Sequence, residues 1–172
     1  MYQLKKISSN DYKQVDALIH QAFEKSDHGY TGEAELVRKL REEANYSKEL
    51  EYIAIQNNQI IGHGLLSEVT LYSENTELIG LCLAPLCVLP DYQGNGVGKA
   101  LITALEKQAS DYPFISILGD PTYYTRFGYQ IAAKFHIEAP FPVPTEAYLI
   151  KELQPKSLSN ISGIIKYPSA FD

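Results

Sequence analysis

The apolar positions of the chain change their period along its length, which predicts alternating strands and helices. Residues 2–7 are expected to form a strand, and a helix follows it. The apolar residues of this helix recur at helical spacing, namely Tyr12, Val15, Leu18, Ile19, Ala22 and Phe23. After a polar segment over residues 24–32, a second, short helix carries Ala34, Leu36, Val37 and Leu40. The chain is therefore expected to open with one strand followed by two helices.

Three β-rich runs come next and lead into a glycine-rich loop. Residues 50–56 and 60–72 are joined by the turn-forming residues 57–59, where two asparagines tolerate positive φ, so these runs predict a hairpin. Residues 78–89 follow a second turn and extend the hairpin to three antiparallel strands. Pro85 lies inside this third run, although proline cannot donate a hydrogen bond to a sheet. We expect a β-bulge there, with an edge strand or a loop as the alternative.

An amphipathic helix and further strands complete the pattern. The helix after the loop buries one apolar face, which consists of Val97, Leu101, Ala104, Leu105 and Ala109. Residues 114–118 form a short buried strand, and this strand–helix–strand unit predicts a right-handed parallel crossover. A proline-rich connector over residues 139–144 precedes a last strand over residues 147–153. The predicted fold class is therefore α/β, with a mixed sheet flanked by helices.

The loop over residues 93–99 has the features of a phosphate-binding site. Glycines alternate at Gly94, Gly96 and Gly98, where the backbone can approach a ligand closely. The helix that follows directs its unpaired N–H groups and the positive end of its dipole at the same place. The alternative interpretation is a glycine-rich turn that binds no ligand.

Two common nucleotide-binding motifs do not match this loop. A nucleotide-hydrolysing P-loop needs a glycine where Gln93 stands and a hydroxyl where Ala100 stands, and Lys99 replaces the last glycine of a dinucleotide fingerprint. The pattern that remains is Gln93-x-x-Gly96-x-Gly98 after a strand. This pattern resembles the pyrophosphate loop of the GNAT superfamily of acetyl-CoA-dependent N-acetyltransferases.

The resemblance implies a fold, an acyl donor and a set of contacts. The GNAT fold has a mixed, mostly antiparallel sheet whose central fourth and fifth strands splay apart beside a bulge in the fourth strand. Pro85 stands where that splay would begin. Acetyl-CoA is the implied donor. The residues implied to bind it are Leu86, Cys87, Val88, Gln93, Gly94, Asn95, Gly96, Val97, Gly98 and Lys99.

A second motif follows the predicted strand over residues 114–118. Tyr124 stands four residues before Gly128-Tyr129, which is the spacing of a tyrosine that GNAT members carry on a short helix. The resemblance implies that this phenol is the general acid that protonates the departing CoA thiolate. Asp120 is expected to cap the short helix. The alternative is a core tyrosine with a satisfied hydroxyl, in a chain that holds 13 tyrosines.

One feature of the family is absent from this chain. Several GNAT members place a glutamate, the general base, six residues before the valine of the fourth strand, and Cys82 occupies that position here. Burial in an apolar strand raises the pKa of a thiol, so Cys82 is expected to be a poor base at neutral pH. Deprotonation of the amine would then pass through water or another group. Glu68 is the nearest candidate by strand order, with a solvated surface carboxylate as the alternative explanation.

Two functions remain open from the sequence. The motifs favour an N-acetyltransferase in which a primary amine of a small molecule or a peptide attacks acetyl-CoA directly. The acceptor is not identified, and its pocket is expected beside residues 24–30 and the strand after Pro140. The alternative is a non-catalytic acyl-CoA-binding module that senses or scaffolds, which the replacement by Cys82 favours. A homodimer is left open.

Composition narrows the remaining classes. A chain of 172 residues with 45% hydrophobic residues suits a single domain over residues 1–172. The formal net charge of −6 argues against nucleic-acid binding. Neither a secretory signal nor an apolar segment of membrane length is present, so a cytoplasmic protein is expected. Cys82 and Cys87 are expected to be free thiols, and the four histidines lack metal-ligand spacing, so no metal is expected.

Overall fold

The computed structural model describes all 172 residues. They form two compact units. Unit 1 comprises Met1–Leu66 and Ala84–Gln108, and unit 2 comprises Ser67–Leu83 and Ala109–Asp172. The expectation of a single domain stays a prediction. No helix of either unit is both long enough and apolar enough to cross a membrane.

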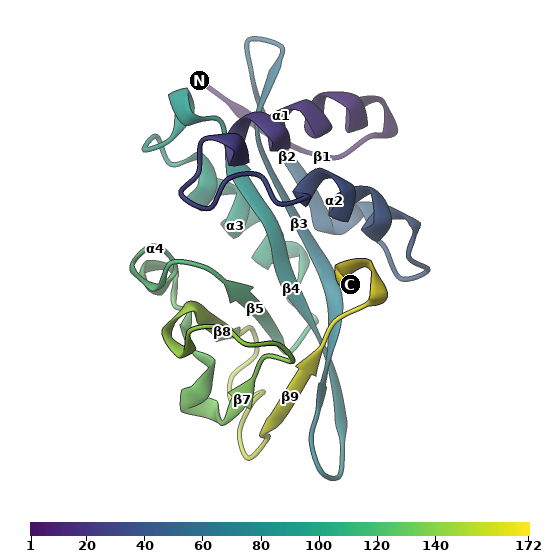
Figure 1. The fold of residues 1–172 in the computed structure, drawn as a ribbon, viewed down its shortest axis with the longest axis vertical. Helices are drawn as coiled ribbons and strands as arrows, with labels where there is room; N and C mark the ends of the chain where they lie inside the picture. The colour runs from purple at the N-terminus through teal and green to yellow at the C-terminus, as the bar shows by residue number, and fades with distance from the viewer. The chain divides into compact units, whose positions relative to one another are not determined.

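Unit 1 contains the expected strand, the two helices after it, the hairpin and the helix after the glycine loop (Figure 1). Its elements are β1 (Gln3–Lys6), η1 (Ser9–Asp11), α1 (Tyr12–Glu24), α2 (Glu33–Glu42), η2 (Lys48–Leu50), β2 (Glu51–Gln56), the first part of β3 (Gln59–Tyr72), the last part of β4 (Glu77–Val88), η3 (Pro90–Tyr92) and α3 (Val97–Gln108). The strands lie in the order β1-β2-β3-β4, and β2 pairs antiparallel with both β1 and β3. The predicted order of elements is confirmed in this unit.

The turn between β2 and β3 is one residue shorter than predicted. Gln59 pairs with Gln56 and belongs to β3, so only Asn57 and Asn58 form the turn. Both asparagines have positive φ, at 50° and 60°. Two left-handed residues in succession match the right-handed twist of the flanking strands, and asparagine adopts this conformation more readily than most residues.

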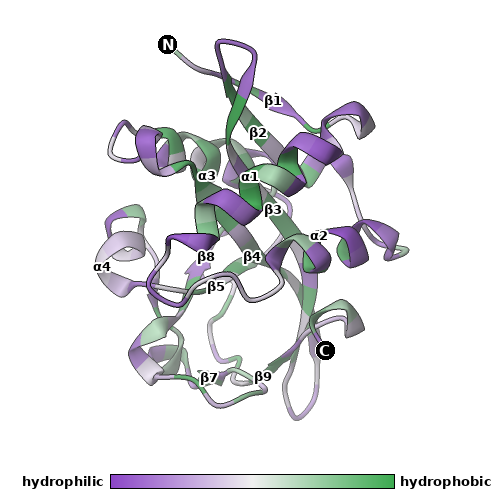
Figure 2. Ribbon diagram, turned by 45° about the horizontal axis from the view of Figure 1, so that its top comes forward, coloured by the Kyte–Doolittle hydropathy of each residue, from purple (hydrophilic) through white to green (hydrophobic).

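Helices cover both faces of the unit 1 strands (Figures 1 and 2). A Cβ added at Gly62 of β3 would lie 3.0 Å from side-chain atoms of Val97 and Leu101, so α3 packs closely on that face. His63 is the next residue of β3 and therefore points to the opposite face, on the side of α1 and α2. Figure 2 shows α1 and α2 with alternating polar and apolar residues above more uniformly apolar strands, as amphipathic helices on a sheet require.

Unit 2 is built on short strands. Its elements are the last part of β3, the first part of β4, β5 (Phe114–Leu118), α4 (Pro121–Tyr124), η4 (Thr125–Phe127), β6 (Gln130–Ile131), η5 (Ala132–Phe135), β7 (Ile137–Glu138), η6 (Thr145–Ala147), β8 (Tyr148–Glu152), β9 (Gly163–Lys166) and η7 (Ser169–Phe171). The strand order is β4-β5-β8-β6, with β9 beside β3 and β7 beside β9. The pair of β4 and β5 is parallel and that of β5 and β8 is antiparallel, which confirms a mixed sheet.

The strand β9 was not expected from the sequence. It has four residues, of which only Ile165 is buried, so it lacks both the length and the alternation of a clear strand. It pairs antiparallel with β3 through Thr70, Leu71 and Tyr72. Gly163 opens it, and a Cβ there would lie 1.9 Å from the Tyr72 carbonyl oxygen, so glycine permits this close approach.

Pro85 is a buried residue of β4, and the pairing of β4 with β3 is irregular. Backbone hydrogen bonds pair Ile61 with Leu89 near one end of the two strands and Ser73 with Thr76 at the other. Between these two pairs β4 has one residue more than β3, so one residue of β4 lacks a partner, as in a β-bulge. The peptide bond before Pro85 is cis. β4 therefore contains one unpaired residue, whereas the position of the bulge at Pro85 and the splay of β4 from β5 stay predictions.

A buried ionic cluster joins α2 to the strands of unit 1. The Glu51 carboxylate accepts hydrogen bonds from Arg41 Nη2 at 2.6 Å and Arg41 Nε at 3.3 Å, and its Oε1 lies 2.7 Å from His63 Nε2. The Tyr46 hydroxyl also donates to it, and the Arg41 guanidinium lies 3.7 Å from the ring centroid of Tyr12. Burial raises the pKa of Glu51, but the bonds from His63 and Arg41 outweigh it and lower this pKa to about 2. Glu51 is therefore a buried anion.

This cluster predicts a loss of stability in acid. Because the pKa of Glu51 is lowered on folding, its contribution is complete above its unfolded value of 4.5 and is lost as the pH falls through about 2. The difference corresponds to roughly 3 kcal/mol of unfolding free energy. Urea unfolding across this pH range should show a steeper decline for the native chain than for Glu51→Gln. The control variant Glu77→Gln, at an exposed position, should lose unfolding free energy with falling pH as the native chain does. Equal slopes of unfolding free energy against pH for all three proteins would contradict the lowered pKa of Glu51.

Candidate acyl-donor and catalytic residues

The connection from β4 to α3 turns at two exposed glycines. Gly94 and Gly96 have φ values of 79° and 81°, in the left-handed region that favours glycine. A Cβ added at Gly94 would have no atom within 4 Å, and one at Gly96 would meet only the Tyr2 hydroxyl, at 3.8 Å. Packing therefore does not require these glycines. The backbone conformation requires them, and it leaves the loop open to close approach from outside.

Side chains of this loop bond to backbone carbonyl groups. Gln93 Nε2 donates to the Val88 carbonyl oxygen at 3.0 Å, and Asn95 Nδ2 donates to that of Tyr92 at 3.4 Å. The hydroxyl of Tyr2, the residue before β1, donates to the Gly96 carbonyl oxygen at 3.3 Å. These bonds hold the loop in shape and use none of its backbone N–H groups. The Gln93 N–H donates to the Pro90 carbonyl oxygen at 3.3 Å, and the later N–H groups of the loop stay available as donors.

The start of α3 provides further donors. The first backbone bond of the helix runs from the Ala100 N–H to the Gly96 carbonyl oxygen at 3.0 Å, so the N–H groups of residues 97–99 have no carbonyl partner one turn earlier. Val97 and Gly98 are buried, whereas Lys99 is exposed. At Val97 and Gly98, therefore, only backbone groups can contact a ligand. Residues 93–99 combine a turn of left-handed glycines with a helix N-terminus, an arrangement that binds anions.

The last residues of β4 alternate between the interior and partial exposure. Cys87 is buried, and Leu86 and Val88 on either side of it are half-buried. Burial raises the pKa of the Cys87 thiol to about 12, and the charge of Glu33 at the start of α2 adds to this effect. Cys82 is also buried and its pKa is likewise about 12, because of burial. Both thiols are free and neutral, so the residue at the family's glutamate position supplies no base at neutral pH.

Tyr124 lies at the end of the short helix α4 in unit 2. Asp120 caps this helix, as predicted, and accepts a hydrogen bond from the Thr122 N–H at 2.9 Å. The Tyr124 ring meets Tyr129 edge-on, with centroids 6.0 Å apart. A Cβ added at Gly119 would lie 2.6 Å from Tyr124 Cε2, so the ring fits against the end of β5 only because residue 119 is glycine. The sequence indicated the position of this tyrosine but not the role of Gly119.

Glu68 has a structural partner. Its carboxylate Oε1 accepts a hydrogen bond from the Tyr112 hydroxyl at 3.0 Å, within unit 2. Burial and this bond raise the pKa of Tyr112. The hydrogen bond from the Tyr112 hydroxyl thus gives Glu68 a structural role, and this role does not require a catalytic one. The structure contains no group of three or more His, Cys, Asp or Glu residues that could hold a metal ion.

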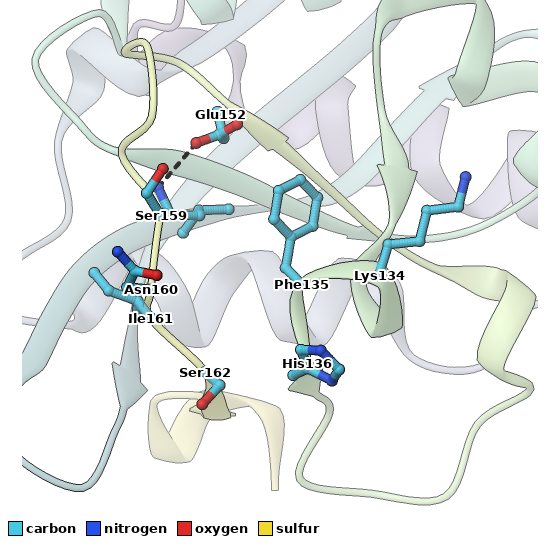
Figure 3. Close-up of a pocket in the computed structure, with 9 residues that line it drawn as sticks. Lys134, Phe135, His136, Glu152, Ser159, Asn160, Ile161 and Ser162 are labelled. Carbon is cyan, nitrogen blue, oxygen red and sulfur yellow. Dashed lines mark hydrogen bonds between the residues drawn. The ribbon is translucent and has the colours of Figure 1, made fainter.

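Two pockets differ in their relation to the predicted site. A pocket of about 270 Å³ in unit 1 brings Glu24 and Lys25, from the expected acceptor segment, together with Asp91 and Tyr92 just before the glycine loop. A larger pocket of about 470 Å³ lies in unit 2 and contains none of the predicted donor-binding or catalytic residues, but its wall includes Glu152 of β8, the strand after Pro140 (Figure 3). Glu152, on the wall of this larger pocket, accepts a hydrogen bond from the Leu158 N–H at 2.9 Å.

Comparison with known proteins agrees with this geometry. Residues 47–131 match the model of the acetyltransferase (GNAT) domain. The chain is 30% identical over 161 residues to the N-acetyltransferase YhbS of Escherichia coli K12, which covers 92% of this chain and 91% of YhbS. The crystal structure of E. coli YhbS in complex with CoA superposes with a TM-score of 0.87 at 28% identity, over 99% of this chain and 91% of that one.

A second solved structure is similar over its whole length. A GNAT family acetyltransferase from Brucella melitensis in complex with acetyl-CoA superposes with a TM-score of 0.77 at 25% identity, over 100% of this chain and 99% of that one. The similarity to YhbS covers far more of the sequence than the glycine loop and the Tyr124 motif. The chain therefore belongs to the GNAT family of acetyl-CoA-dependent N-acetyltransferases.

Proposed function

We propose that the chain transfers the acetyl group of acetyl-CoA to a primary amine of a small molecule or a peptide by direct attack of the amine on the thioester. The observation that carries this proposal is the loop of Gly94 and Gly96 at the start of α3, because it presents backbone donors and a helix dipole to a pyrophosphate. The complexes of YhbS with CoA and of the Brucella enzyme with acetyl-CoA support this choice of ligand.

The donor would extend from the loop along β4. Residues 93–99 would hold the pyrophosphate, and backbone groups of Leu86, Cys87 and Val88 would bind the pantetheine arm. This second part requires β4 to separate from β5. The proposal is supported by the short parallel pairing of the two strands in unit 2, which covers Leu81 and Cys82 of β4, and by the one unpaired residue of β4.

Tyr124 would complete the reaction as the general acid. When the tetrahedral intermediate collapses, the C–S bond breaks, and the phenol gives its proton to the sulfur of the departing CoA thiolate. The packing of its ring supports this role, because Gly119 and Tyr129 hold the ring in place. A side chain held in this way can deliver a proton from a fixed position.

The donor site can be tested by thermal shift. Acetyl-CoA at about 100 times its Kd should stabilise the native chain by about 2.7 kcal/mol, which is a rise in Tm of roughly 5–10 °C. Gly96→Asp should abolish this rise, because it fills the approach to the loop and adds a repulsive charge. Gly29→Asp is the control, since Gly29 also has positive φ and no atom within 4 Å of its added Cβ. An equal rise in both variants would exclude the loop as the pyrophosphate site.

The role of Tyr124 can be tested with an amine found by screening for CoA release. Tyr124→Phe keeps the ring but removes the proton, so kcat should fall by roughly two orders of magnitude while the Kd for acetyl-CoA changes little. Tyr123→Phe removes the neighbouring hydroxyl and should keep the native kcat. A native kcat in Tyr124→Phe would assign protonation of the thiolate to water, whereas loss of folding in this variant would favour a purely structural tyrosine.

A further inference from the structure

A buried histidine of unit 1 lies outside the residues proposed to bind the donor or to protonate the thiolate. His63 is fully buried, and its Nδ1 atom has no hydrogen-bond partner in the protein. Its other ring nitrogen, Nε2, lies 2.7 Å from Glu51 Oε1. A buried polar nitrogen without a partner is costly, so a position that keeps one requires an explanation.

The partners of Glu51 determine which nitrogen of His63 carries the proton. The Glu51 carboxylate is ionised because hydrogen bonds lower its pKa to about 2 against the effect of burial. A carboxylate only accepts hydrogen bonds, so His63 Nε2 must be the donor. In the neutral imidazole the lone pair then lies on Nδ1, which can accept a proton. A carboxylate that fixes the tautomer of a histidine in this way is the arrangement of a general base with its orienting group.

The pairing of β3 with β4 places His63 beside the part of β4 that is expected to bind the acyl donor. The Leu89 N–H donates to the Ile61 carbonyl oxygen at 2.8 Å. In a regular ladder this bond pairs His63 with Cys87, and the backbone of His63 bonds to the Cys87 thiol. Paired residues of neighbouring strands point to the same face of the sheet. Cys87 belongs to the three residues proposed to bind the pantetheine arm, so His63 lies one strand away from the thioester segment.

Helix α2 bounds the same face at both of its ends. Arg41, in its last turn, bonds to Glu51, and Glu33, in its first turn, is close enough to Cys87 to raise the pKa of the thiol. The expected acceptor segment, residues 24–30, leads into the start of α2. An amine bound by that segment would therefore enter at the end of the face that holds Glu33 and Cys87, with His63 as the next titratable side chain along it.

We propose that His63 Nδ1 is the general base that takes the proton from the acceptor ammonium through one ordered water, while Glu51 holds the imidazole in the required tautomer. The proposal rests on the acetyl transfer proposed above. It supplies the base that Cys82 cannot provide. Ordered water is the usual partner of a buried polar atom that has no protein partner, so a water bonded to Nδ1 would be the relay.

The protons of the reaction balance on these two groups. The acceptor enters as R–NH3⁺, and one proton passes through the water to His63 Nδ1. The free amine attacks the carbonyl carbon, the C–S bond breaks, and Tyr124 protonates the sulfur. The second proton of the nitrogen returns to the Tyr124 phenolate, and the imidazolium releases its proton to solvent. The imidazolium formed in this step faces the negative Glu51, which also bonds to Arg41.

Two small acceptors separate the base from a structural role. Butylamine is an ammonium ion at neutral pH and needs a base, whereas methoxyamine is already neutral and does not. His63→Gln keeps an N–H donor where Nε2 bonds Glu51 but lacks the basic nitrogen. It should lower kcat/KM for butylamine by roughly 100-fold and leave that for methoxyamine nearly unchanged. The exposed His136→Asn should change neither rate, because asparagine tolerates the positive φ at that position.

The outcomes distinguish this proposal from the proposed function. Equal losses for both amines in His63→Gln would make His63 structural, and no loss for either would exclude it as the base. Transfer to none of the amines in the screen for CoA release by the native chain would refute the proposed acetyl transfer itself.

A measurement on the native chain decides the case even if His63→Gln does not fold. The pH at which the rising limb of kcat/KM levels off should be the same for primary amines of different basicity, because it reports a base on the protein. Without such a base, this pH should shift with the pKa of each amine, and that result would overturn the proposal.

Discussion

The left-handed backbone at Gly94 and Gly96 is the constraint on which the proposed donor site depends. It lets the chain leave β4 and begin α3 within a few residues, so that the end of the strand, the loop and the helix N-terminus lie together. Gly62 contributes from the other side, because it lets α3 approach β3 closely. A side chain at Gly94 or Gly96 would strain the loop, and a Cβ at Gly62 would displace the side chains of Val97 and Leu101 by a few tenths of an ångström.

The second organising feature is the buried anion Glu51, which connects a helix to two strands. Its bonds to Arg41 and His63 combine structural support with control of a tautomer. Removing one partner of such a cluster is costly, because it leaves a buried charge unpaired. A stability measurement alone therefore cannot separate the two roles of His63. The distinction has to come from chemistry, namely from acceptors that differ only in whether they must lose a proton.

The sequence allowed most of the fold to be predicted, because the longer elements have clear periodicity. It also located the glycine loop and Tyr124, whose motifs are local in sequence. It did not reveal β9, which is short and mostly exposed, or the role of Gly119, since both depend on contacts between distant segments. The cluster of Arg41, Glu51 and His63 was missed for the same reason. Scattered polar residues in apolar segments were its only signal, and pairing across strands cannot be read from spacing along one strand.

Amide hydrogen exchange with and without acetyl-CoA tests the central claim most directly, because the proposed ligands are backbone N–H groups. Saturating acetyl-CoA should slow exchange at residues 94–99, which lie in the exposed loop and at the unpaired start of α3. Exchange around the pocket of unit 2 lined by Lys134 and Ser162 should not change. If acetyl-CoA binds and the amides of residues 94–99 exchange as fast as in the free protein, the loop is not the pyrophosphate site and the account of the donor is wrong.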